Sequence, residues 1–126
     1  MRSLNGTIWR VTEARAFDEA GHQLQPLGSH PIGLVIFEAE RMLVAVGDGR
    51  TSLPSNAAPR FFVAYTGSYK FDGVKLITWV DGASKPEVIV EQVRHIRFES
   101  ETRMVAVPVS GLPGQSGIEV VWERVS

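Results

Sequence analysis

The sequence predicts an all-β fold, specifically an eight-stranded antiparallel up-and-down barrel. Three observations favour this fold: eight segments rich in β-branched and aromatic residues follow one another, no segment has a helical apolar stripe, and most connections are short. Short connections join antiparallel neighbours, and closing eight strands into a ring removes exposed edges and leaves room for one small ligand. A β-sandwich is the alternative, because the sequence does not show whether the first and last strands pair.

The first half of the chain contains a strand, a long loop and a hairpin. We expect a strand over residues 6–17 and then a polar loop that contains several Gly and Pro residues. Strands over residues 33–39 and 42–46 are separated by Glu40 and Arg41, a spacing typical of a tight hairpin, although neither residue favours a positive φ. The loop over residues 49–60 has no periodicity, and we expect it to cover a binding site.

The second half contains five strands. Alternation over residues 61–71 places five aromatic and apolar side chains on one face, namely Phe61, Val63, Tyr65, Tyr69 and Phe71. Asp72-Gly73 is the preferred dipeptide of a two-residue type I′ turn and leads into a strand over residues 74–80. Further strands are expected over residues 87–99, 103–109 and 117–125, with Pro108 at a strand end because it cannot donate to a ladder.

The bulk composition is that of one globular domain spanning residues 1–126. Apolar residues make up 44% and charged residues 21%, which is close to the average of folded domains. The formal net charge of -1 offers no basic surface for nucleic acid, so nucleic acid is not an expected partner. No apolar run reaches the roughly 18 residues that span a bilayer. The start has no signal-peptide core, so we expect a soluble, cytoplasmic protein.

Two polar residues interrupt the core-facing side of the strand over residues 87–99. Side chains along a strand repeat every two residues, so Gln92 and Arg94 share a side with four apolar residues, Val88, Val90, Ile96 and Phe98. A guanidinium and a carboxamide in such a row are costly without partners. They therefore indicate either a ligand with an anionic or carbonyl group, or an internal ion pair with Glu13 or Glu38 that closes one end of the barrel.

Other candidate side chains have two interpretations each. Tyr65 and Tyr69 either orient a polar group of a ligand or pack in the core with their hydroxyls at the rim. Trp79 and Trp122 pose the same choice, with packing as the default. The chain lacks cysteine, and its three histidines have no partners at metal-ligand spacing: they are His22, His30 and His95. We therefore expect no metal and no other cofactor, and no nucleophile motif is present.

Several short motifs, taken in order, resemble the lipocalin-like domain family, small relatives of the calycin barrels. They are Gly6-Thr7 with Trp9, Pro26-Leu27-Gly28 leading to Pro31 and Gly33, Tyr65-x-Gly67-x-Tyr69, Glu91-Gln92-Val93-Arg94, and Val121-Trp122-Glu123-Arg124. The resemblance covers essentially the whole chain. It implies a barrel open at one end, with Trp9 near the closed end and Arg124 stacking across it, and it implies a ligand cavity without supplying the ligand.

These observations lead us to expect a module that binds a small hydrophobic molecule with one polar or anionic end. The residues expected to hold it inside the barrel are Arg94, Gln92, Tyr65, Tyr69 and Trp122. Two alternatives stay open. One is an enzyme that isomerises, cyclises or hydrates a hydrophobic metabolite in the same cavity. The other is a barrel filled by its own side chains that acts through its surface, for example as a homodimer along Ile89 and Val93.

Overall fold

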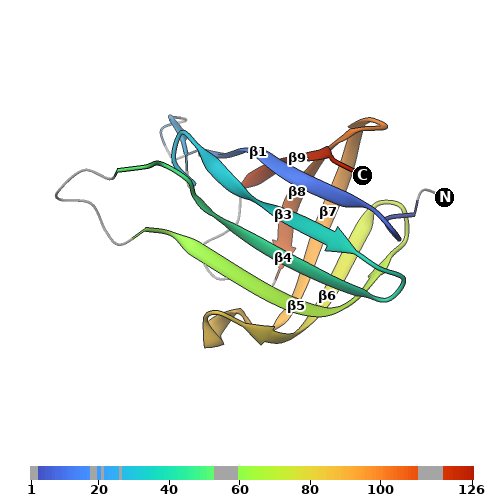
Figure 1. The fold of residues 1–126 in the computed structure, drawn as a ribbon. Helices are drawn as coiled ribbons and strands as arrows, with labels where there is room; N and C mark the ends of the chain where they lie inside the picture. The colour runs from blue at the N-terminus through green and yellow to red at the C-terminus, as the bar shows by residue number, and fades with distance from the viewer. Residues whose placement is uncertain (1–2, 18–19, 21, 26, 53–59, 111–117) are drawn as a thin grey trace.

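A computed structural model describes residues 3–17, 20, 22–25, 27–52, 60–110 and 118–126. These residues form nine antiparallel strands and one short 3-10 helix, η1 (Figure 1). The elements are β1 (Ile8–Phe17), β2 (Gln23–Leu24), β3 (Pro31–Phe37), β4 (Arg41–Asp48), β5 (Phe62–Phe71), β6 (Lys75–Ala83), η1 (Pro86–Val88), β7 (Glu91–Ser100), β8 (Arg103–Ser110) and β9 (Glu119–Arg124). Within these ranges, no helix is long and apolar enough to cross a bilayer.

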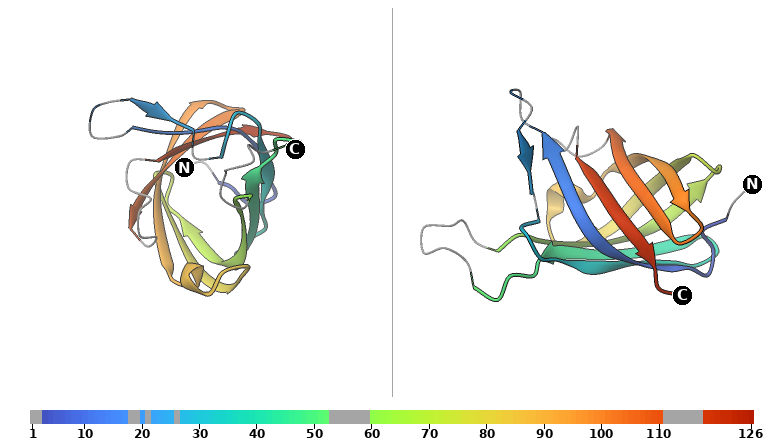
Figure 2. Two further views of the ribbon diagram at one scale, coloured as in Figure 1. Left: turned by 90° about the vertical axis from the view of Figure 1, so that its left-hand side faces the viewer. Right: turned by 90° about the horizontal axis from the view of Figure 1, so that it is seen from above.

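Eight of the strands close into a ring. From β3 to β9 each strand pairs with the next in chain order, β1 pairs with β3, and β9 pairs back with β1, where Ala14 lies opposite Val120. Figure 2 shows this ring, with the left view looking along the barrel. The short strand β2 pairs only with the end of β1, in a segment where the sequence predicts a loop. The predicted up-and-down barrel is confirmed, and the β-sandwich is not the fold.

One end of the barrel is packed with buried side chains. Trp9 is 2% exposed, its indole N–H donates to the Thr7 hydroxyl at 2.8 Å, and its ring lies 6.2 Å from the Phe98 ring. The buried side chain of Leu4 belongs to the same core. Arg124 lies opposite Trp9 in the β1–β9 pairing and keeps an exposed side chain whose Nε donates to the Ser126 carbonyl. Trp9 therefore lies in the packed end of the barrel.

The hairpin between β5 and β6 is present, but its turn is not type I′. A type I′ turn needs positive φ at both central residues. Gly73 has φ 102, whereas no described residue other than glycine has a positive φ. The Asp72 carboxylate instead accepts hydrogen bonds from the Val74 and Lys75 amides at 2.9 and 2.6 Å. Phe71 pairs with Leu76, and the Asp72 amide donates to the Lys75 carbonyl. Gly73 and Val74 therefore lie between the strands, one position later than predicted, and the predicted turn type is wrong.

The predicted strand over residues 87–99 begins later than expected. Residues 86–88 form η1, because Pro86 has no amide hydrogen and its fixed φ suits the first turn of a helix. Val90 is consequently 37% exposed and does not face the core as predicted. From β7 onward the predicted alternation holds, with Gln92 and Ile96 buried and the opposite side exposed at Glu91, His95, Arg97 and Glu99.

Two valines on the outer face of the barrel are completely covered. Val105 and Val121 lie opposite one another in β8 and β9, and both are 0% exposed. Charged side chains from β1, β7, β8 and β9 form a chain of ion pairs around them. The pairs are Arg15–Glu119, Arg97–Glu119, Arg97–Glu99, Arg103–Glu99, Arg103–Glu123 and Arg10–Glu123. The aliphatic stems of such side chains can bury apolar groups while the charged ends stay in water.

Candidate functional site

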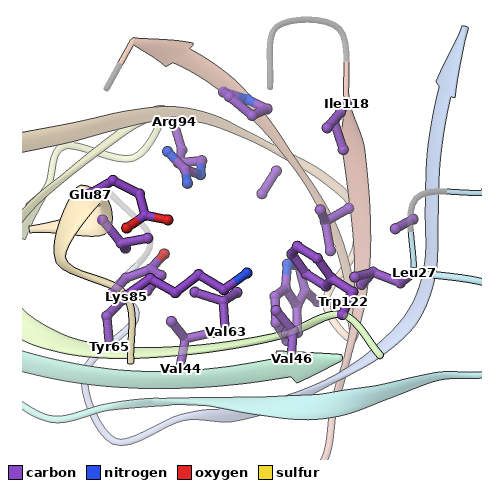
Figure 3. Close-up of a pocket in the computed structure, with 16 residues that line it drawn as sticks. Leu27, Val44, Val46, Val63, Tyr65, Lys85, Glu87, Arg94, Ile118 and Trp122 are labelled. Carbon is purple, nitrogen blue, oxygen red and sulfur yellow. The ribbon is translucent and has the colours of Figure 1, made fainter. Parts of the chain in front are cut away.

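A cavity of about 320 Å³ lies inside the barrel (Figure 3). Most of its walls are apolar, with major contributions from Val44, Val46, Val63, Ala106, Val120 and Trp122. Among the described residues, four lining side chains carry a charged group or a hydroxyl, namely Tyr65, Lys85, Glu87 and Arg94. The volume lies at the lower end of the roughly 300–1,000 Å³ typical of ligand pockets. The interior is therefore hollow, which argues against the alternative of a barrel filled by its own side chains.

Arg94 brings a guanidinium from β7 into the wall of this cavity. Its Nη2 donates to the side-chain oxygen of Gln92 at 2.6 Å, while its Nη1 is buried and has no hydrogen-bond partner among the described residues. The expected alternative, an ion pair with Glu13 or Glu38, is not formed. Glu13 instead lies 3.6 Å from Arg15, and Glu38 is exposed between β3 and β4.

Gln92 lies behind the guanidinium and does not line the cavity. Its side chain is 1% exposed, and its Nε2 donates to the Val88 carbonyl of η1 at 3.4 Å. Its oxygen accepts the hydrogen bond from Arg94. The carboxamide thus links η1 to Arg94 and fixes the direction in which the guanidinium points, which is a positioning role.

The two tyrosines expected at the site lie in different parts of the barrel. Tyr65 lines the cavity, and burial raises the pKa of its phenol, an effect that the nearby Arg94 charge partly offsets. The phenol therefore stays protonated at neutral pH and can donate a hydrogen bond. Tyr69 lies in the packed end, where its ring meets Phe37 edge-on at 5.2 Å and its hydroxyl donates to the Glu38 carbonyl. It does not line this cavity.

Trp122 lies in the cavity wall as expected, whereas Trp79 lies outside the barrel. The Trp79 indole N–H donates to the Glu91 carboxylate at 2.9 Å on the outer surface, so the default interpretation of core packing is wrong for this residue. Ile89 is exposed and Val93 is half-buried, and a dimer along them stays a prediction. Among the described residues, no group of acidic, cysteine and histidine side chains is placed to hold a metal ion.

Lys85 and Glu87 are cavity residues that the sequence interpretation missed. The Lys85 ammonium lies 4.9 Å from the centre of the Phe61 ring, a cation–π distance. Glu87, expected on the wet side of a strand, instead faces the cavity from η1 (Figure 3). The available signal was the Lys85-Pro86 pair, because a residue before proline is extended and a proline often begins a helix.

A hydrogen-bonded ion pair with a buried carboxylate and a partly exposed guanidinium lies where the two ends of the connection between β4 and β5 meet. The Asp48 carboxylate binds the Arg50 guanidinium, with Nη2 and Oδ2 2.6 Å apart, and the Asp48 carbonyl accepts from Arg60 at 2.7 Å. The Arg50 hydrogen bonds hold the pKa of Asp48 below its usual value. A side chain at Gly28 would come within 2.8 Å of this carboxylate, so the backbone at Gly28 lies close against Asp48, and the neighbouring Leu27 lines the cavity. Of the predicted covering loop, residues 53–59 lie outside the described residues.

The comparisons agree with this architecture. A family model described as a lipocalin-like domain matches residues 6–125, which include every strand of the ring. A search of the curated proteins and a search of the solved structures gave no match. The resemblance expected from the short motifs is thus confirmed across the barrel, and the chain belongs to the lipocalin-like domain family.

Proposed function

We propose that the barrel binds a small, mostly apolar molecule with one polar or anionic end inside its cavity. The observation that carries this proposal is the distribution of side chains around the cavity. Figure 3 shows Tyr65, Glu87 and Arg94 toward one side, while Leu27 and Trp122 lie across from them. A ligand with one polar end and an apolar body matches both sides.

The cavity volume limits the size and the affinity of the ligand. At about 30 Å³ for each water-sized group, roughly a dozen non-hydrogen atoms fill the 320 Å³. Burial of their apolar surface contributes about 25 cal/mol per Å² before the costs of association. At roughly 0.5 kcal/mol per atom, such a ligand binds with about 6 kcal/mol, which corresponds to a Kd of tens of micromolar.

The fluorescent, uncharged probe 4-(dimethylamino)benzonitrile tests this proposal, because its eleven non-hydrogen atoms fit the estimated size limit. We expect a saturable increase in its emission with the native protein. The Val44→Phe substitution adds a phenyl ring to the cavity wall and should abolish that increase. Leu43→Phe is the matched control, because Leu43 directly precedes Val44 in β4, is 44% exposed and faces outward.

Thermal unfolding of both variants confirms that each is folded before the titrations are compared. Equal probe binding by Val44→Phe and the native protein would place the probe elsewhere and reject the cavity as the binding site. A native protein that gives no saturable signal contradicts the proposal in its simplest form. Native mass spectrometry of the freshly purified protein provides an independent readout, because a co-purified hydrophobic compound adds a discrete mass.

The same cavity supports a second candidate function, an enzyme acting on a hydrophobic carbonyl compound. The observation in its favour is that Glu87, a carboxylate able to accept a proton, shares the cavity with the Arg94 cation and the Tyr65 phenol, which can stabilise an enolate. Deuterium exchange next to the carbonyl of 2-tetralone, followed by NMR, tests it. The enzyme should accelerate the exchange and Glu87→Gln should not, whereas a native rate equal to background rejects this function.

A further inference from the structure

Arg94 is a cation whose surroundings in the barrel hold no matching anion. Its side-chain partners are the uncharged carboxamide of Gln92 and the neutral phenol of Tyr65, and its Nη1 is buried without a partner among the described residues. It forms no ion pair with any carboxylate in the described part of the chain. Buried arginines are usually paired, because removing a guanidinium from water is costly. An anionic group of a ligand that enters the cavity would therefore neutralise the charge of Arg94.

The other charged groups around the cavity do not balance it. Lys85 adds a second positive charge, and Glu87 adds one negative charge from an exposed position on η1. Glu87 makes no ion pair among the described residues with either cation. Tyr65 remains an uncharged donor. The described side chains that line the cavity therefore carry one net positive charge, in a space where apolar walls strengthen electrostatic interactions.

The geometry of the guanidinium selects the shape of the anion. Gln92 occupies one Nη2 hydrogen and holds the plane of the group, so the Nη1 side is the part that remains free to donate. A planar carboxylate accepts from such a fork through two oxygens. A ketone or amide oxygen can accept one of these hydrogen bonds, but it leaves the positive charge unmatched.

We propose that the ligand is a monocarboxylate whose carboxylate binds Arg94 and whose apolar body lies against Trp122 and Val120. This inference rests on the binding function proposed above and names the chemical class of the ligand. Gln92 is the positioning residue of this arrangement. The acid enters as its anion, and its single negative charge neutralises the net positive charge of the cavity lining.

Two probes that differ only in charge test the proposal: 2-naphthoate and its near-isosteric neutral relative, 2-naphthamide. Each has thirteen non-hydrogen atoms, about the number that the cavity can hold. In titrations by isothermal calorimetry, the native protein should bind the carboxylate about tenfold or more tightly than the amide, as expected for a charge-assisted hydrogen bond. Equal affinities, tighter binding of the amide, or no binding of either probe would overturn the proposal.

Variants separate a direct contact from a general effect of charge. Arg94→Met should remove the preference for the carboxylate, because it weakens carboxylate binding much more than amide binding. Arg94→Lys should keep part of the preference, and Gln92→Leu should reduce it without weakening amide binding. Retention of the full preference in Arg94→Met contradicts the assignment. If Arg94→Met does not fold, the comparison of the two probes on the native protein still decides.

The smaller uncharged probe 4-(dimethylamino)benzonitrile shows whether a failed test concerns only the ligand class or the binding function as well. If it binds in the cavity and the carboxylate shows no advantage, the cavity is a ligand site but the ligand class is wrong. If neither this probe nor the naphthalene pair binds, the proposed binding function fails as well. Leu43→Phe, on the outer face of β4, should leave all three affinities unchanged and serves as the control.

Discussion

Replacing Gln92 by leucine should lower the stability of the protein, because it removes a hydrogen-bond acceptor of Arg94 inside the barrel. Gln92 is 1% exposed and accepts the 2.6 Å hydrogen bond from the guanidinium. Leucine has a similar volume but offers no acceptor, so Arg94 loses this partner. Hydrogen bonds to charged groups contribute about 1.5–3 kcal/mol. We expect Gln92→Leu to lower the free energy of unfolding by about 2 kcal/mol, or the melting temperature by roughly 6–10 °C in a domain of this size.

The double variant carrying Arg94→Met as well should recover this loss. It replaces both members of the buried pair by apolar groups, a change that is often neutral or stabilising. Arg94→Met alone leaves the Gln92 oxygen without its donor and should cost about 1 kcal/mol. Urea unfolding without ligand, followed by tryptophan fluorescence, gives the four free energies of a double-mutant cycle. If the two single effects add, or if the double variant is no more stable than Gln92→Leu, the reasoning is refuted.

Three further sets of variants test the barrel away from Arg94. Hydrogen bonds from the Arg50 guanidinium hold the pKa of Asp48 below 3.8, so the ionised carboxylate stabilises the fold above that pH, and this stabilisation is lost as the pH falls through the lowered pKa. In urea unfolding, the native protein should therefore lose stability more steeply in acid than Asp48→Asn, and equal slopes of stability against pH would exclude this contribution. Gly33→Ala should unfold at a much lower temperature than Gly6→Ala. Both glycines have positive φ, but the new Cβ at Gly33 would overlap the Ala45 carbonyl of β4, whereas Gly6 faces open space; similar melting temperatures would contradict the β3–β4 register. Val105→Ala should cost about 2 kcal/mol in chemical denaturation, against less than about 0.5 kcal/mol for the exposed Val109→Ala on the same strand, and a small effect at Val105 would show that the ion pairs do not cover it.

The barrel could be predicted from the sequence because its signal is local and repeated. Alternation of apolar and polar residues fixes which side of each strand faces inward, and short connections fix antiparallel neighbours. The turn was predicted one residue too early and with the wrong type, because Gly73 and Val74 lie between the strands and the Asp72 carboxylate accepts from the Val74 and Lys75 amides. Closure through β1 and β9 depends on pairing between the two ends of the chain, which no local pattern reports.

The sequence predicted those residues of the candidate site that lie on strands. Alternation placed Arg94, Tyr65 and Trp122 inside the barrel, and all three line the cavity. Tyr69 shares a strand face with Tyr65, but four residues at about 3.4 Å each separate them along β5, so Tyr69 reaches the packed end instead. Glu87 was not predicted, because side chains of the 3-10 helix η1 do not alternate as they do in a strand and the direction of the Glu87 side chain depends on tertiary packing.

A crystal structure with bound 2-naphthoate tests the central claim most directly, because it locates the ligand and the guanidinium together. We predict that the naphthalene rings occupy the cavity against Trp122 and that a carboxylate oxygen lies about 2.7–2.9 Å from Nη1 of Arg94. A naphthoate bound only on the outer surface, or an Arg94 side chain turned out into solvent with the cavity empty, would contradict the account.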